Sequence, residues 1–208
     1  MKNTALSRAL KWLFIAQLLT IAAMLPLVYD LRSLLRAVSV LLTLAALVRA
    51  AGEVSAYRTA LGLQAAALAL DVLSYALVRW LIYVLVNMFG AWAVQIVGAL
   101  SALLSIAGLA LGLLLLRQIC LTTAGLVDDP AVAARGIWAW RVNLICTAAG
   151  IVLTIAVSAL LKTGLDMETL SVLSMAVTLP SILLTLVSKV LYMVFLYQSA
   201  RLLEETEK

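Results

Sequence analysis

The sequence predicts an all-α integral membrane protein of about six transmembrane helices, arranged as three hairpins, with both termini in the cytoplasm. The composition is the first reason. Of 208 residues, 65% are hydrophobic and 12% are charged, and the mean hydropathy is +1.14. A soluble domain is about a quarter charged, so lipid is the expected solvent. The apolar runs are also long and unbroken, which favours helices over the short alternating strands of a membrane barrel.

Six stretches approach the length of about 20 apolar residues that a membrane span needs. The predicted spans are 12–29, 34–51, 59–79, 91–116, 142–161 and 169–198, within a single transmembrane domain of residues 1–208. Basic residues precede the first run, as in a signal peptide. That run is longer than a signal core and further spans follow it, so we interpret it as an uncleaved first helix.

The distribution of basic residues predicts the orientation. Ten of the fifteen lie on the side of the N-terminus: Lys2, Arg8, Lys11, Arg49, Arg58, Arg117, Arg135, Arg141, Arg201 and Lys208. Four lie on the other side, namely Arg32, Arg36, Arg79 and Lys162, while Lys189 falls inside a span. Since cytoplasmic loops are rich in Lys and Arg, both termini are expected inside the cell, in the cytoplasmic membrane of a bacterium.

Residues 117–141 are predicted to form a cytoplasmic connector containing a short interfacial helix. Asp129 is a favourable N-cap, and Pro130 suits the first helical position because no amide hydrogen bond is lost there. Trp138 and Trp140 suit the headgroup layer. The connector either only joins two spans or also forms a docking surface for a regulator, and the sequence leaves both alternatives open.

Three predicted spans have a face of small or polar side chains, because such residues recur every three or four positions. In 169–198 these are Ser171, Ser174, Thr178, Ser181, Thr185, Ser188 and Tyr192; in 91–116 they are Gln95, Gly98, Ser101, Ser105, Gly108 and Gly112; in 142–161 they are Asn143, Thr147, Gly150, Thr154 and Ser158. Small residues permit close helix packing, which we favour for Gly98, Ser101, Ser105, Gly108 and Gly112. For 169–198, packing and a hydrophilic pathway remain equal alternatives. Pro180 in that span is a candidate hinge.

Asp71 and Lys189 are ionisable residues inside spans, where charge is costly and commonly functional. Each lies about 18–20 Å along its helix from an arginine at the cytoplasmic end. We therefore hypothesise an Asp71–Lys189 ion pair. It belongs to a solute or ion pathway formed by Asp71, Lys189, Gln64, Tyr75, Thr178, Ser181, Thr185 and Ser188. Alternatively, the pair only fixes the helix register, or the two side chains reach towards opposite membrane surfaces.

Catalysis, cofactors and metals are not expected. The chain has no histidine, and its two cysteines, Cys120 and Cys146, are far apart in sequence. No glycine-rich phosphate loop followed by lysine is present. The net charge of +5 is explained by membrane orientation, so nucleic acid is not an expected partner.

Two functions from different classes remain. The first is solute transport, by the chain alone or as a membrane-embedded subunit of a transporter, with the lipid bilayer, a small-molecule solute and a second copy or other membrane subunits as partners. The second is a non-transporting assembly, regulatory or immunity partner. A water-accessible cavity touching Asp71, Ser181, Thr185 and Lys189 would favour transport, whereas a dry core would favour the second function.

Overall fold

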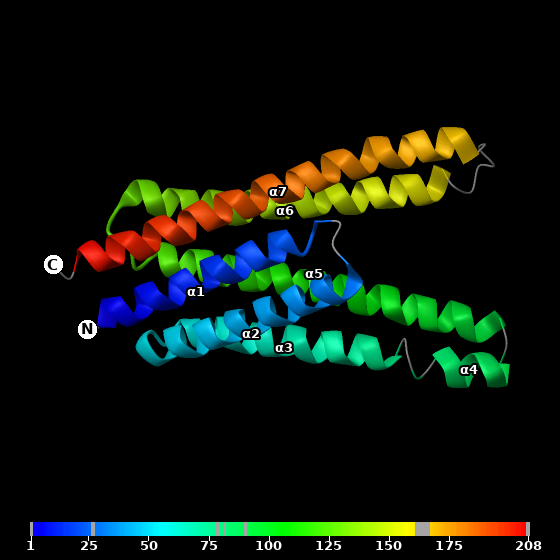
Figure 1. Cartoon of the computed structure of the whole chain (residues 1–208), viewed down its shortest axis with the longest axis horizontal. Helices are drawn as coiled ribbons and strands as arrows, with labels where there is room; N and C mark the ends of the chain where they lie inside the picture. The colour runs from blue at the N-terminus through cyan, green and yellow to red at the C-terminus, as the bar shows by residue number, and fades with distance from the viewer. Residues whose placement is uncertain are drawn as a thin grey trace.

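The computed structural model describes residues 2–25, 28–77, 80, 82–89, 91–160 and 167–206. Over these ranges the regular elements are helices: α1 (Lys2–Ala22), α2 (Tyr29–Glu53), α3 (Tyr57–Ala76), α4 (Ile82–Phe89), α5 (Ala91–Ala124), α6 (Pro130–Leu160) and α7 (Met167–Glu205) (Figure 1). The all-α prediction is therefore confirmed. By length and composition, five stretches of the described residues could each cross a membrane: Thr4–Ala22, Tyr29–Glu53, Tyr57–Ala76, Gln95–Ala124 and Ile182–Glu205.

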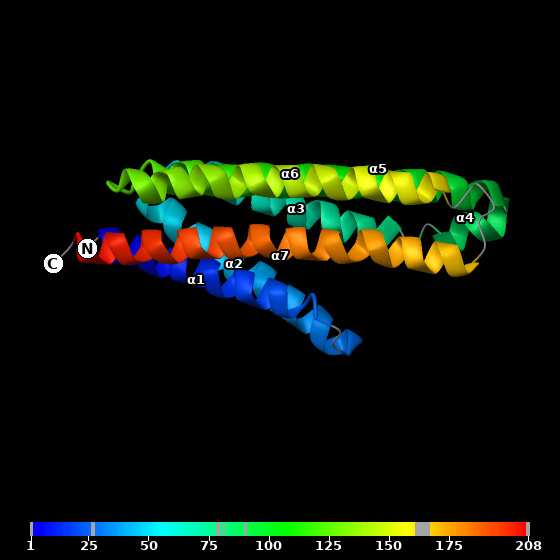
Figure 2. The same ribbon diagram turned by 90° about the horizontal axis from the view of Figure 1, so that it is seen from above.

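The six long helices form a closed ring. In order around the ring, α1 packs against α2, α2 against α3, α3 against α5, α5 against α6, α6 against α7, and α7 against α1 again. The short α4 packs against α5. Both termini lie at one end of the bundle, together with the α2–α3 and α5–α6 turns (Figures 1 and 2). We call this the terminal end. Figure 2 shows the α1–α2 hairpin diverging from the other helices towards the opposite end.

Near the terminal end, buried side chains from all six long helices and the α5–α6 turn form one hydrophobic cluster. It comprises Leu6, Ala9, Leu10, Leu13, Ala46, Leu47, Ala50, Ala51, Tyr57, Ala60, Leu116, Ile119, Cys120, Val127, Val132, Ala139, Tyr192, Phe195, Leu196, Ala200 and Leu203. At Gly136 an added Cβ would lie 2.6 Å from the ring of Phe195, so α6 and α7 approach closely there. Close van der Waals packing of these side chains holds the six long helices together at this end.

Polar contacts reinforce the cluster. The Ser7 hydroxyl donates to the carbonyl of Ala200 at 2.8 Å, which joins α1 to α7. The hydroxyl oxygens of Tyr57 and Thr123, both buried, lie 2.6 Å apart and join α3 to α5. Each of these buried hydroxyls therefore has the partner that burial requires.

Helices α5, α6 and α7 extend beyond the predicted spans. With 34, 31 and 39 residues, they are longer than the roughly 30 Å of a bilayer's hydrocarbon core at about 1.5 Å per residue. Only residues 125–129 separate α5 from α6, and the predicted interfacial helix is the first part of α6. The reason is that Cys120 and Val132 pack into the hydrophobic cluster and keep both helices continuous. The predicted cap is confirmed, since the Asp129 carboxylate accepts from the amide of Ala131 at 2.8 Å.

The position of the first helix also differs from the predicted span. Residues 12–29 were expected to form one helix, but α1 ends at Ala22 and Tyr29 begins α2. At its start, α1 reaches back to Lys2 because Leu6 and Leu10 pack into the hydrophobic cluster. The apolar run therefore gave neither the start nor the end of α1.

Candidate functional site

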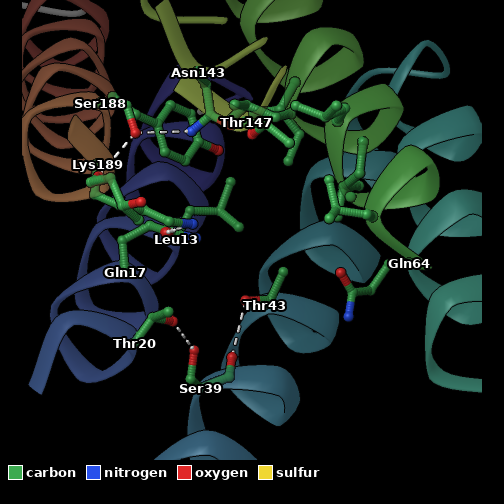
Figure 3. Close-up of a pocket in the computed structure, with 18 of the residues that line it drawn as sticks. Leu13, Gln17, Thr20, Ser39, Thr43, Gln64, Asn143, Thr147, Ser188 and Lys189 are labelled. Atoms are coloured by element: carbon green, nitrogen blue, oxygen red, sulfur yellow. Dashed lines mark hydrogen bonds between the residues drawn. The ribbon is translucent and has the colours of Figure 1, made fainter. Parts of the chain in front are cut away.

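A cavity of about 380 Å³ lies inside the ring, and all six long helices line it (Figure 3). Its lining comprises Leu13, Gln17, Thr20, Ser39, Val40, Thr43, Gln64, Leu109, Gly112, Leu113, Leu115, Leu116, Ile119, Asn143, Cys146, Thr147, Thr185, Ser188, Lys189 and Tyr192. Leu13, Leu116, Ile119 and Tyr192 belong also to the hydrophobic cluster. The cluster therefore closes the cavity on the side of the terminal end.

Half of the described lining residues are polar. They are Gln17, Thr20, Ser39, Thr43, Gln64, Asn143, Thr147, Thr185, Ser188 and Lys189, and they come from α1, α2, α3, α6 and α7. The polar groups thus surround the cavity instead of following one helix, while α5 contributes leucines, an isoleucine and Gly112. Such a lining can hold water or a solute that forms hydrogen bonds.

Among the described residues of this lining, the charged one is Lys189. Its Nζ donates to Oε1 of Gln17 at 3.2 Å, across the contact between α7 and α1. A lysine ammonium has three donors, and Gln17 accepts one of them. Lys11 pairs with Glu204 and Arg201 with Glu205, and no ion pair joins Lys189 to a carboxylate of the described residues.

Two neutral amides, Asn143 on α6 and Gln64 on α3, also line the cavity and differ in their hydrogen bonding. Asn143 donates through Nδ2 to the hydroxyl of Ser188 at 3.2 Å, and that hydroxyl donates to the carbonyl of Thr185 at 2.8 Å. These bonds fix an amide of α6 beside Lys189. On α3, Gln64 is buried and lies across the cavity from Lys189 in Figure 3. No hydrogen bond from Gln64 to another described residue is formed.

Near the α1–α2 contact, hydroxyl groups bond to one another and to the backbone. Ser39 donates to the carbonyl of Ala16 at 2.8 Å, and its oxygen lies 2.7 Å from that of Thr20. Thr43 donates to the carbonyl of Ser39 at 2.9 Å. These hydroxyls are therefore structurally satisfied, unlike the amide of Gln64.

The structure brings together some of the predicted pathway residues. Gln64, Thr185, Ser188 and Lys189 all line the cavity. The side chains of Thr178 and Ser181 lie outside the described part of the structure. Pro180 is exposed, and α7 continues through it.

The hypothesised Asp71–Lys189 ion pair does not form. Asp71 and Tyr75 are exposed on α3 and do not line the cavity. The ring order is the reason, because α3 packs between α2 and α5 whereas α7 packs between α6 and α1. Asp71 and Lys189 were predicted to lie at the same depth in the membrane, but equal depth does not bring two residues together when their helices are not neighbours.

The small residues predicted for packing on α5 differ in their surroundings. An added Cβ at Gly108 would lie 3.4 Å from the side chain of Leu70 on α3, so this glycine does face a neighbouring helix. At Gly98 and Gly112 the corresponding space is open, and Gly112 lines the cavity. Ser105 donates to the carbonyl of Ser101 at 2.8 Å, within its own helix.

Sequence reasoning missed the cavity residues of α1 and α2. Gln17 and Thr20 are three residues apart, and Ser39 and Thr43 are four apart, so each pair shares a helix face. The same spacing rule that identified the face of α7 could have found these short pairs. Gln17 was also an amide inside a predicted span, which is itself an unusual feature.

The chain matches no protein-family model, no curated protein and no solved structure.

Proposed function

We propose that this chain is a multi-pass protein of the bacterial cytoplasmic membrane that transports a small solute, alone or as the membrane-embedded solute-binding subunit of a transporter. The cavity is its solute site. The observation that supports this proposal is the polar cavity inside a closed ring of six helices, with Lys189 among its lining residues. Uncompensated polar and charged groups are costly within a membrane, so a bundle that only packed would be expected to exclude them.

Arginine–tryptophan contacts support the cytoplasmic orientation of the terminal end. The guanidinium of Arg49 lies 5.6 Å from the ring centre of Trp12, and that of Arg117 lies 5.7 Å from the ring centre of Trp140. Tryptophan favours the headgroup layer, and basic residues favour its cytoplasmic side. In the proposed orientation these pairs mark the inner membrane surface.

The depth of the cavity follows from the same pairs. Gln17 lies five residues after Trp12, a distance of about 8 Å along α1, and Thr43 lies six residues before Arg49, about 9 Å along α2. The cavity would therefore sit within the hydrocarbon layer, nearer its cytoplasmic surface. Since the hydrophobic cluster closes the cytoplasmic side, solute would enter from the opposite side and leave only after this cluster opens.

A cavity-filling substitution tests the proposal. Gly112 on α5 lines the cavity and has open space at its Cβ position, so Gly112→Phe should fill the cavity without displacing another helix. Gly98→Phe is the matched control, because Gly98 lies on the same helix, also has open space and does not line the cavity. Both variants and the wild type would be purified in mild detergent and analysed by native mass spectrometry for bound small molecules and protein chains.

The expected result is a small molecule bound to the wild type and to Gly98→Phe but absent from Gly112→Phe. Reconstituted vesicles should then accumulate that molecule only with the first two proteins. A stoichiometric protein partner without any bound solute, unaffected by Gly112→Phe, would overturn the proposal in favour of an assembly or regulatory role.

A further inference from the structure

If the cavity is the solute site of the proposed function, its charge balance limits the chemical class of the solute. Lys189 contributes one positive charge to the lining, and no carboxylate is among the lining residues that the structure describes. Lys189 is half-buried, and an ammonium inside a membrane span without a counter-ion is costly. Gln17 supplies a neutral acceptor at 3.2 Å, which satisfies one donor of the ammonium and leaves its charge uncompensated.

From this balance we infer that the cavity binds a small anion, a carboxylate or a phosphate, whose charged oxygens contact Nζ of Lys189. Hydrogen bonds between an ammonium and an anionic oxygen are about twice as strong as neutral ones. Such an anion would compensate the positive charge of Lys189 and would also accept hydrogen bonds from its remaining N–H donors. Neither a cation nor a neutral solute would provide this compensation.

The rest of the lining defines the remainder of the ligand. Gln64 lies across the cavity from Lys189 and makes no hydrogen bond to other described residues, so its amide can serve a second polar group. Leucines of α5, including Leu109 and Leu113, line the cavity as well. A volume of about 380 Å³ lies at the small end of ligand sites. The lining therefore fits a compact organic anion with an apolar middle and a hydrogen-bonding group at the far end.

Two sources can supply this anionic chemistry, namely a free solute from water and the headgroup of an anionic lipid. Both would place charged oxygens on Lys189. Their difference is testable, because a free carboxylate or phosphate binds in detergent without added lipid, whereas a headgroup requires the lipid itself.

The test measures thermal stabilisation of the detergent-purified protein by short carboxylates, by inorganic phosphate and by the corresponding uncharged amides at matched ionic strength. The wild type should be stabilised by one or more of the anions and not by the amides. Lys189→Met, which keeps the side-chain length and removes the charge, should weaken anion binding about tenfold or more. Lys189→Arg should retain part of it. Lys11→Met is the matched control, because Lys11 is paired with Glu204 at the terminal end and should leave anion binding unchanged.

Folding of Lys189→Met is checked in the same experiment. Removing an uncompensated charge should raise the melting temperature of the anion-free protein, so a well-folded variant that no longer responds to anions supports the inference. Stabilisation only by vesicles containing phosphatidylglycerol, lost in Lys189→Met, supports the same site with a headgroup as its ligand. Equal stabilisation by anions and amides, or an unchanged anion response in Lys189→Met, overturns the inference.

The inference and the proposed function can fail separately. If Gly112→Phe abolishes binding of an uncharged solute, transport through the cavity stands and the anion inference fails. If no solute binds to the wild type in any of these assays, both fail.

Discussion

Nζ of Lys189 on α7 donates to Oε1 of Gln17 on α1, and the two atoms are 3.2 Å apart. The contact joins a charged side chain of the last helix to an amide of the first. Because α1 and α7 are neighbours in the ring, their contact determines where the Lys189 ammonium lies in the cavity.

Replacing Gln17 by Leu should destabilise the protein by about 1.5–3 kcal/mol, because the ammonium of Lys189 then loses its described acceptor. The measurement is the free energy of unfolding in detergent. The control is Gln118→Leu, since Gln118 makes only a longer bond of 3.4 Å to Thr122 within α5 and does not line the cavity. Equal losses in the two variants would contradict a specific role for the Gln17–Lys189 contact.

Introducing an acid at the same position should neutralise the cavity. Gln17→Glu places a carboxylate where Oε1 now accepts from Lys189, so an internal ion pair replaces the need for a bound anion. We expect anion stabilisation to fall about tenfold or more while the protein stays folded. Thermal shifts with short carboxylates and phosphate measure this effect. A variant that binds anions as tightly as the wild type would argue against Lys189 as their contact.

Gly136→Ala should destabilise the protein by about 1–3 kcal/mol, because its Cβ would lie 2.6 Å from the ring of Phe195. Gly150→Ala on the same helix has open space and should be neutral or stabilising by up to about 1 kcal/mol. Opposite signs in chemical denaturation would confirm the close approach of α6 and α7. Two equally mild effects would contradict it.

Tyr57→Phe and Thr123→Val should each reduce stability by about 1–3 kcal/mol, because each leaves one buried hydroxyl without its partner. The double variant should be more stable than the sum of the two losses implies. A double-mutant cycle of unfolding free energies gives the coupling. Tyr197→Phe serves as the control, since Tyr197 is exposed and the substitution keeps the ring that packs against Phe14. Strict additivity would contradict the Tyr57–Thr123 bond.

Asp71→Asn and Lys189→Met should behave independently. Asp71 is exposed on α3, and Lys189 faces the cavity from α7, so the two changes in stability should add to within about 0.3–0.5 kcal/mol. The same denaturation experiment measures both singles and the double. A coupling energy well above this margin would contradict the structure and support an Asp71–Lys189 ion pair.

The fold class could be predicted because lipid imposes simple rules on the chain. Long apolar runs require helices, so the number of long helices followed from the sequence. Helix ends did not follow, because Leu6 and Leu203 lie outside the predicted spans and continue α1 and α7 into the hydrophobic cluster, where burial against other helices determines those ends.

The candidate site was only partly predictable. Helical spacing placed Thr185 and Ser188 on one face with Lys189 nearby, and all three line the cavity. The partner of Lys189 was not predictable, because spacing gives depth and direction along one helix but not which helix lies opposite. Gln17 is 172 residues away in sequence and meets Lys189 only because the ring closes between α1 and α7.

Ring closure also has a consequence for biosynthesis. The bond from Ser7 to Ala200 spans 193 residues, so it cannot form until nearly all of the sequence has left the ribosome. Until then, Lys189 and the amides of earlier helices lack the neighbours that enclose them. Insertion of the first five long helices would therefore yield an open, unfinished intermediate in the bilayer, and membrane chaperones or quality-control proteases would meet the chain at that stage.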